Sequence, residues 1–180
     1  MLDWLVEKTE GSAGPICDLG CGPGQAARYL SSRVCSVCGI DVSPEMVKCA
    51  RRLNPAISFQ QGDMRALSGV ADHTFRGVAA FYSIVHVLSA DVVNALREIR
   101  RVLRPRGVLL LAFHIGREIV HKDEWWGQQV SVDFIFYETG AMKNYPRAAG
   151  FEVEEAIERD PYGVDVEYPS RRAYIFARRV

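Results

Sequence analysis

Short apolar runs alternate with amphipathic stretches through the first two thirds of the chain. Runs of strand length cover residues 34–40, 57–60, 75–81 and 108–113, and a shorter one ends at Cys17. Their near-continuous apolar character indicates strands that are covered on both faces, as in a parallel sheet. We therefore predict five such strands.

Stretches with helical spacing separate the predicted strands. Residues 25–30, 44–53 and 90–103 predict helices, and the last of these repeats apolar residues at Val93, Leu96, Ile99, Val102 and Leu103. A strand–helix repeat of this kind predicts an α/β fold with right-handed crossovers.

The last third of the chain departs from this repeat. A strand with one buried face is predicted by alternating apolar residues at Val130, Val132, Phe134 and Phe136. Residues 140–149 predict a short helix that is disturbed by Pro146.

The first predicted strand is joined to the next helix by a glycine-rich turn, Cys17-Asp18-Leu19-Gly20-Cys21-Gly22-Pro23-Gly24. We expect the missing Cβ atoms of Gly20 and Gly22 to let a ligand lie against bare backbone. The helix that follows presents free N–H groups to a polar ligand. The dinucleotide pattern would place its third glycine at Gln25, and a carboxylate at Asp18 suits an ammonium group better than a pyrophosphate. A tight turn without a ligand is the plainer interpretation.

Acidic residues follow the second and third predicted strands. Asp41 stands where a carboxylate can accept hydrogen bonds from both hydroxyls of a ribose. A helix cap is the alternative role, but Ser43 already provides a cap with Pro44 after it. We expect Asp63 to accept from an adenine amino group while Met64 packs on the ring; a surface Gly-Asp turn is the alternative.

Four segments together resemble the class I S-adenosylmethionine (SAM) methyltransferases. They occur in the family's order and spacing, within residues 14–113, at 18–24, 39–46, 62–64 and 103–109. The resemblance implies an α/β, Rossmann-like fold with helices on both faces of a seven-stranded, mostly parallel sheet, in which strand seven is antiparallel. Residues 150–154 and 172–178 then correspond to strands six and seven. We expect residues 1–180 to form a single domain.

The resemblance also implies SAM as the cofactor and S-adenosyl-L-homocysteine as its product. The residues expected to bind the cofactor are Asp18, Gly20, Cys21, Gly22, Gly24, Asp41, Val42, Met46, Gly62, Asp63, Met64, Phe81 and Tyr82. The chain departs from the family at Arg76, where an acid is usual, and at Arg106, where glycine is frequent. Few residues precede the first strand, so we expect part of the family's cofactor lid to be missing.

Methyl transfer from a sulfonium is a direct displacement, for which the protein must orient the acceptor and exclude water. A base is needed only if the acceptor loses a proton. By their positions at strand ends, the candidates are Tyr82, His86 and His114. A packing role is the alternative for His86.

Residues 115–137 are the least similar to the family, and we expect them to form the acceptor site or a lid. Trp125 or Trp126 is expected to provide an aromatic wall, which could also hold a cationic acceptor. Packing is the alternative role for at least one of these tryptophans. A partner subunit in a homodimer is another source of cover for the cleft.

The composition limits the classes of partner. A chain of 180 residues, 48% of them hydrophobic, can bury a sizeable core. Twenty-two basic residues balance 22 acidic ones, which gives no support for a nucleic-acid or anionic-membrane partner. No apolar run approaches the ~20 residues of a membrane span, and the N-terminus lacks a signal-peptide pattern. We expect a cytoplasmic protein.

Five cysteines fall in the first third of the chain, at Cys17, Cys21, Cys35, Cys38 and Cys49. The C-x-x-C pair raises the alternative of a zinc site. Cys17 is expected in the first strand, Cys21 in the glycine turn, and Cys35 and Cys38 in the second strand, which favours reduced thiols without metal or disulfide.

The sequence therefore predicts a methyltransferase that acts on an O or N nucleophile of a small molecule. The Asn/Asp-Pro-Pro-aromatic motif of amino-methylating DNA and glutamine enzymes is absent from residues 81–84. A nicotinamide dehydrogenase is disfavoured by Asp18 and Gln25. An RNA or protein methyltransferase and a non-catalytic SAM-binding scaffold remain alternatives.

Overall fold

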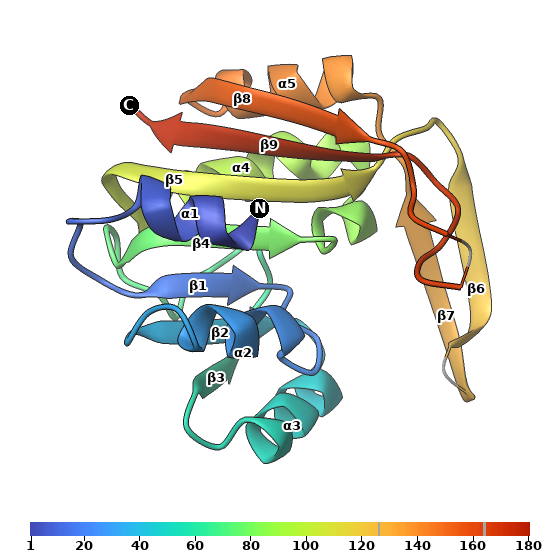
Figure 1. Cartoon of the computed structure of the whole chain (residues 1–180), viewed down its shortest axis with the longest axis horizontal. Coiled ribbons are helices and arrows are strands. Elements are labelled where there is room, and N and C mark those ends of the chain that lie inside the picture. Colours follow the sequence, from blue (N-terminus) through green and yellow to red (C-terminus); the bar gives the residue numbers. More distant parts are fainter. Residues whose placement is uncertain (126, 164) are drawn as a thin grey trace.

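A seven-stranded sheet forms the centre of the molecule, in a computed structural model that describes residues 1–125, 127–163 and 165–180. In spatial order its strands are β3 (Ser58–Gln61), β2 (Val37–Asp41), β1 (Ile16–Leu19), β4 (Phe75–Phe81), β5 (Leu103–His114), β9 (Arg172–Arg179) and β8 (Phe151–Arg159) (Figure 1). Strands β1 to β5 pair in parallel, and β9 lies antiparallel between β5 and β8. The predicted fold class is confirmed.

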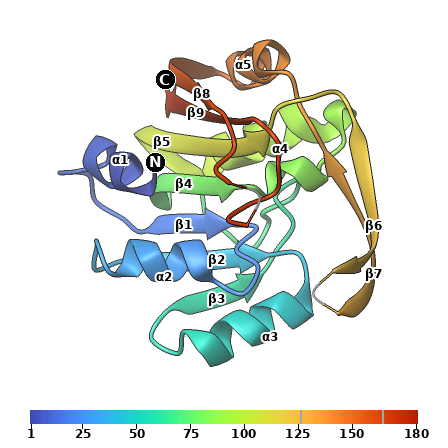
Figure 2. The ribbon, with the colours of Figure 1, turned by 45° about the vertical axis from the view of Figure 1, so that its right-hand side comes forward.

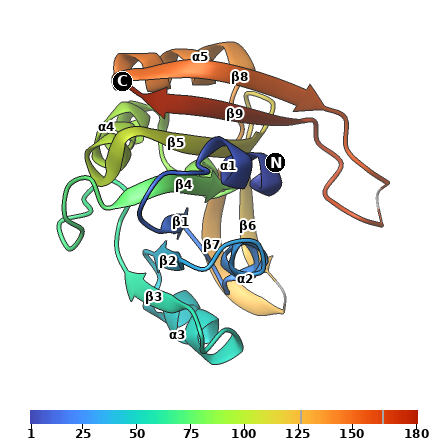
Figure 3. The same ribbon diagram turned by 60° about the vertical axis from the view of Figure 1, so that its left-hand side comes forward.

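Helices cover both faces of this sheet. On one face lie α1 (Leu2–Lys8) and α2 (Gln25–Ser31), and on the other α4 (Ser89–Val102) and α5 (Thr139–Ala148) (Figures 1 and 3). The remaining α-helix, α3 (Pro44–Leu53), contacts β2 and β3. A short 3-10 helix, η1, covers Ile84–His86. Leu96, Ile99 and Val102 of α4 are fully buried in the core, as their spacing predicts, whereas Val93 is only partly buried.

The strand order reverses between β1 and β4, which lie side by side in the middle of the sheet. All four residues of β1 are buried, and β2 and β4 pair with it from opposite sides. Open α/β sheets bind ligands at such a reversal, beyond the carboxyl ends of the strands. The glycine-rich turn follows β1 at this point.

The boundaries of several elements differ from the prediction. The helix was predicted to end at residue 103 and the next strand to begin at residue 108, but α4 ends at Val102 and β5 already begins at Leu103. The pairing of β4 with β5 shifts between Phe75 and Gly77, and Arg106 has a φ of 63°, so an irregular extension precedes the regular ladder. Strand β8 also continues to Arg159, beyond the predicted residues 150–154.

A β-hairpin occupies most of residues 115–137. Its strands, β6 (Ile119–Trp125) and β7 (Gln128–Ile135), pair antiparallel and lie beyond the carboxyl ends of the central strands (Figure 2). The predicted alternation holds at Val130 and Val132, which are half-buried between exposed neighbours, but it ends at residues 135–137, which are all buried. Strand β6 was not predicted, because the charged residues 121–124 hide the alternation.

The cysteines are free thiols, and one of them lies outside its expected element. Cys35 is exposed ahead of β2, so its placement in the second strand was wrong, whereas Cys17 and Cys21 are buried. Among the residues that the structure describes, no group of three or more His, Cys, Asp or Glu could hold a metal ion. No helix in the same part of the chain is long and apolar enough to cross a membrane.

The packing of β2 on β3 can be tested at Gly39. A Cβ there would lie 2.4 Å from the ring of Phe59, which is itself buried. We expect Gly39→Ala to lower the free energy of unfolding by about 1–3 kcal/mol through overpacking, as measured by urea denaturation. Gly69→Ala is the control, because its Cβ would meet nothing within 4 Å. Equal stability of the two variants would contradict this account.

Candidate functional site

The glycines of the turn after β1 serve different purposes. Gly20, Gly22 and Gly24 all have positive φ angles, which only glycine adopts freely. A Cβ at Gly20 would lie 2.2 Å from the Cβ of Ser83, so chain packing requires this glycine, and the expected approach of a ligand to its backbone remains a prediction. At Gly22 a Cβ would meet nothing within 4 Å, which leaves open space above its backbone. Gly22 therefore fits the expected role of ligand approach.

Asp18 is buried beneath the turn, with 2% of its surface exposed. Its Oδ2 accepts a hydrogen bond of 2.8 Å from the backbone N–H of Ala27, in the first turn of α2. Burial raises the pKa of this carboxyl from 3.8 to about 7, against the opposing effect of that hydrogen bond. The side chain thus ties the end of β1 to α2, and its contact with a ligand's ammonium group remains a prediction.

Asp41 connects the turn to the next helix. Its Oδ2 accepts from the N–H of Gly22 at 2.8 Å, and its Oδ1 accepts from the N–H of Ser43 at 2.9 Å. Ser43 caps α3, as predicted, by accepting from the N–H of Met46. Each carboxylate oxygen retains a further acceptor direction for the predicted ribose contact. Val42 and Met46 beside it are 60% and 37% exposed, and their apolar surface is available to a nucleoside.

Asp63 has a partner that the sequence analysis did not anticipate. Arg65 binds its carboxylate, with an Nη2–Oδ2 distance of 2.6 Å, and this contact lowers the pKa of Asp63. An adenine amino group would have to share the same oxygens. Met64 is half-buried against the core, and the N–H of Gly62 donates to the carbonyl of Asp41.

The remaining predicted cofactor residues lie at the edges of this region. Cys21 is buried, and its side chain packs with Ala27, Val47, Ala50 and Phe59. Any contact of Cys21 with a cofactor would therefore involve its backbone. Phe81 is half-buried at the end of β4, and its ring lies edge-on to that of Tyr82, with centroids 5.0 Å apart.

A cavity of about 410 Å³ lies between the carboxyl ends of β4 and β5, the β6–β7 hairpin and the segment before β9. Its ring-bearing walls are Tyr82, His114, Phe134, Phe136 and Tyr168. Its other lining residues are Val120, Lys122, Glu124 and Arg172. The sequence analysis named Tyr82, His114 and the segment 115–137, to which five of the other lining residues belong, but it did not name Tyr168 or Arg172.

Ser83 joins this cavity to the glycine turn. Its Oγ donates a 2.5 Å hydrogen bond to the carbonyl of Leu19, and its Cβ occupies the space that a side chain at Gly20 would need. Tyr82, the preceding residue, lines the cavity and has a φ of 59°. A ligand over Gly22 and a ligand in the cavity would therefore both lie next to residues 82 and 83.

A chain of polar contacts holds Tyr82. Its hydroxyl lies 2.8 Å from that of Tyr174, which accepts a 3.1 Å hydrogen bond from Arg159. Glu167 binds both Arg159, at 2.6 Å, and Arg172, at 3.1 Å. Burial and the neighbouring Tyr174 raise the pKa of Tyr82. Tyr82 is thus protonated at neutral pH, which disfavours its candidacy as a base.

The two histidine candidates have different surroundings. His114 lines the cavity, where its ring stacks on Phe136 and its Nδ1 lies 2.6 Å from Oγ of Ser170. Burial, together with the charge of Arg172, lowers the pKa of His114 to about 4, so the ring is neutral at pH 7. His86 does not line the cavity; its Nδ1 lies 2.9 Å from the carbonyl of Asp133.

The tryptophan prediction falls largely on residues without a structural description. Trp126 lies outside the described residues, and of Trp125 only the backbone, at the end of β6, is described. Their role as an aromatic wall therefore remains a prediction. The aromatic wall that the structure shows is built instead from Phe134, Phe136 and Tyr168.

Comparison with known proteins identifies the class to which this site belongs. The sequence profile of the family described as "Methyltransferase domain" matches residues 16–107, which include the turn, Asp41 and Asp63. The chain belongs to the class I SAM-dependent methyltransferase family, and SAM is the cofactor that this family and its structural neighbours indicate.

Individual relatives match over part of their length. The chain is 34% identical over 111 residues to trans-aconitate 2-methyltransferase of Azoarcus sp. strain BH72, covering 61% of this chain and 42% of that protein. It is 35% identical over 120 residues to the methyltransferase GfsG of Streptomyces halstedii, covering 62% and 42%. The chain thus spans less than half the length of these curated relatives.

The fold matches over nearly the whole chain. The crystal structure of a SAM-dependent methyltransferase from Methanosarcina mazei superimposes with a TM-score of 0.83 and 16% sequence identity. The match covers 98% of this chain and 97% of that one. At this level of identity it supports the fold alone.

The raised pKa of Asp18 predicts a pH dependence of stability. The folded state holds a proton that the unfolded state releases above about pH 3.8, so the contribution of Asp18 is lost as the pH rises towards about 7. We expect the free energy of unfolding of the wild type to fall relative to that of Asp18→Asn as the pH rises through this window. Above about pH 7 the difference between the two proteins should stay constant. Urea denaturation at each pH measures both values. A constant difference between the two proteins from pH 4 to pH 7 would contradict the assignment.

Asp41 is expected to support cofactor binding through its two backbone contacts and the predicted ribose contact. In Asp41→Asn one of the N–H groups of Gly22 and Ser43 would face an amide N–H. We expect SAM affinity to fall by about 1–3 kcal/mol, measured by calorimetry on folded protein. The control is Asp72→Asn, which changes an exposed carboxylate ahead of β4, at the edge of the sheet opposite the glycine turn. Unchanged affinity in Asp41→Asn would leave this residue with a structural role only.

Proposed function

We propose that this chain transfers the methyl group of SAM to an O or N nucleophile of a small molecule held in the 410 Å³ cavity. The observation that supports this most is the contact between Ser83 and the glycine turn, because it puts the cavity directly beside the turn that follows β1. A donor over Gly22 and an acceptor against Tyr82 would then be neighbours.

The dimensions and lining of the cavity favour a small acceptor. Rings from β4, β5, β7 and the segment before β9 surround the space, so apolar parts of an acceptor can be desolvated there. Lys122 and Glu124 add one charge of each sign on β6 and can orient polar groups. The similarity to trans-aconitate 2-methyltransferase also supports a small-molecule acceptor.

SAM supplies an activated methyl group, and the side chains of the protein orient the acceptor and exclude water. The cavity walls align the acceptor and exclude water, an effect that can contribute about 7–11 kcal/mol to lowering the barrier. For an acceptor that loses a proton, we propose His114 as the residue that takes it. The neutral ring can receive a proton on Nε2 if Nδ1 donates to Oγ of Ser170.

The activity can be tested with methyl-labelled SAM and a panel of small carboxylates, phenols and amines. We expect label in at least one small product, together with stoichiometric S-adenosylhomocysteine. RNA and protein extracts, offered in parallel, should remain unlabelled. Labelling of those extracts alone would favour the macromolecular alternative. Tight SAM binding without any transfer would favour the non-catalytic scaffold.

The proposed role of His114 predicts a selective defect. For an acceptor that must be deprotonated, His114→Asn should reduce kcat by about 10²–10⁴-fold and leave the dissociation constant of SAM unchanged. Since the pKa of His114 is about 4, the ring is neutral between pH 5.5 and 8, and its titration should not change the rate of the wild type in this range. His86→Asn is the comparison, because His86 lies outside the cavity lining. Similar rates in all three proteins would exclude His114 as a base.

A further inference from the structure

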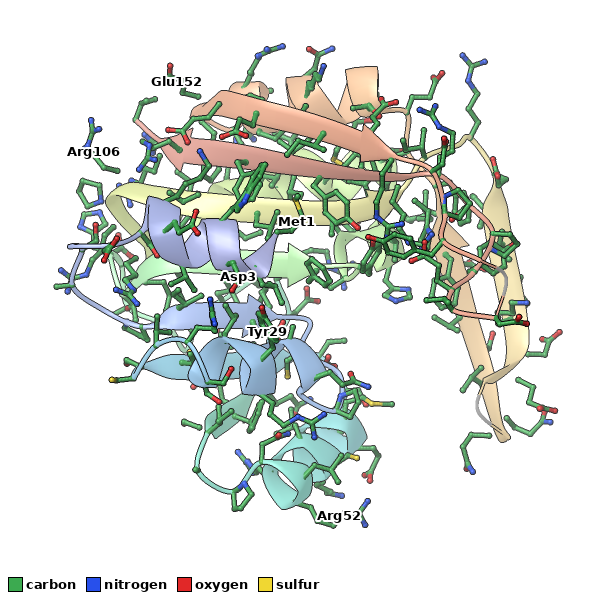
Figure 4. The ribbon with its side chains drawn as sticks, in the orientation of Figure 1. Met1, Asp3, Tyr29, Arg52, Arg106 and Glu152 are labelled. Atoms are coloured by element: carbon green, nitrogen blue, oxygen red, sulfur yellow. The ribbon has the colours of Figure 1, made fainter. Side chains whose placement is uncertain are left out.

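A second cavity lies at the opposite edge of the sheet, where the parallel strands begin. It has a volume of about 390 Å³ and is enclosed by the loop after α1, the start of β4 and the first residues of β5. Figure 3 brings this edge forward, and Figure 4 labels Arg106 there. The glycine turn and the aromatic cavity lie at the other ends of the same strands, so this space is separate from the proposed active site.

Cationic side chains dominate the lining of the second cavity. Arg76 and Arg104 contribute guanidinium groups, His73 contributes a ring, and no carboxylate is among the lining residues. Among the described residues, neither arginine forms an ion pair. Arg76 is the residue that stands where the family usually has an acid. The cavity therefore has a net positive charge that the fold does not neutralise.

The hydrogen-bonding capacity of Arg76 is also incompletely used. Its Nη1 donates a 3.3 Å hydrogen bond to the carbonyl of Ser12, whereas its Nε is buried without a partner. A guanidinium offers five N–H donors in a planar arrangement that matches phosphate oxygens. An anionic ligand would supply the acceptors that this side chain lacks.

The surroundings of the cavity add to the positive charge. Arg179 donates a 2.9 Å hydrogen bond to Nε2 of His73. A neutral His73 therefore carries its proton on Nδ1, which can donate a hydrogen bond. Burial and the charge of Arg100 lower the pKa of Arg179. The nearby carboxylate of Asp72 already binds Arg101 at 2.7 Å. Little negative charge is left to neutralise the positive charge of the cavity lining.

We propose that the second cavity, lined by His73, Arg76 and Arg104, binds a small phosphate-bearing anion of about the size of pyrophosphate. Arginine pairs with phosphate through charge-assisted, bidentate hydrogen bonds, which are stronger than those between neutral groups. The volume accommodates such an anion. This site is independent of methyl transfer and does not require the proposed function to be correct.

Titration calorimetry with inorganic pyrophosphate at low ionic strength tests the proposal. We expect saturable binding to the wild type, weakened about tenfold or more in Arg76→Gln/Arg104→Gln, because two charge-assisted contacts are lost. Arg52→Gln, with the same type of charge change on α3 far from this edge (Figure 4), should bind as the wild type does. Added salt should weaken the binding, since the site is partly open to solvent.

Two further measurements keep the outcome unambiguous. SAM affinity and the urea midpoint of the double variant should equal those of the wild type, and each single variant is measured if the double variant is unstable. Saturation with S-adenosylhomocysteine should leave pyrophosphate binding unchanged. Absence of binding, equal weakening in Arg52→Gln, or displacement by S-adenosylhomocysteine would each overturn the proposal.

Discussion

Close contact between Gly20 and Ser83 connects the two halves of the proposed active site. Because Gly20 has no side chain, Ser83 can lie against the turn and donate its hydroxyl hydrogen to the carbonyl of Leu19. This contact holds the end of β4 beside the end of β1, at the point where the strand order reverses. The position of Tyr82, and with it one wall of the aromatic cavity, depends on this contact.

Buried carboxylates give the turn its shape. Asp18 binds the first turn of α2 and Asp41 binds Gly22, so each acid satisfies backbone N–H groups that would otherwise lack partners. The two side chains differ in electrostatic cost, since burial raises the pKa of Asp18 to about 7. A cationic group of a bound cofactor would offset that cost, which gives the predicted ammonium contact a physical basis.

The two ends of the sheet have opposite chemical character. Where the strands end, rings and a few charged side chains surround a largely apolar space; where they begin, arginines surround a polar one. The parallel strands β1, β4 and β5 keep the two spaces apart, so each can be altered without rebuilding the other. Arg76 and Arg104 therefore offer a separate means of testing what the second space binds.

The local pattern of the sequence determined the parallel sheet, the glycine turn and the cap at Ser43, because each depends on residues that are close together in the chain. It also indicated Tyr82 and His114 through their positions at strand ends. It did not reveal the pairing of Asp63 with Arg65, strand β6, or Tyr168 and Arg172 as cavity walls. Asp63 and Arg65 are only two residues apart, but their pairing depends on side-chain conformations that the hydrophobic pattern does not encode. Tyr168 and Arg172 reach the cavity from a segment that is distant in the chain, and a charged strand such as β6 becomes recognisable only when its partner β7 is in place. The proposed acceptor cavity therefore depends on tertiary packing, whereas the glycine turn, where we predict the cofactor to bind, follows from a local motif that the sequence encodes directly.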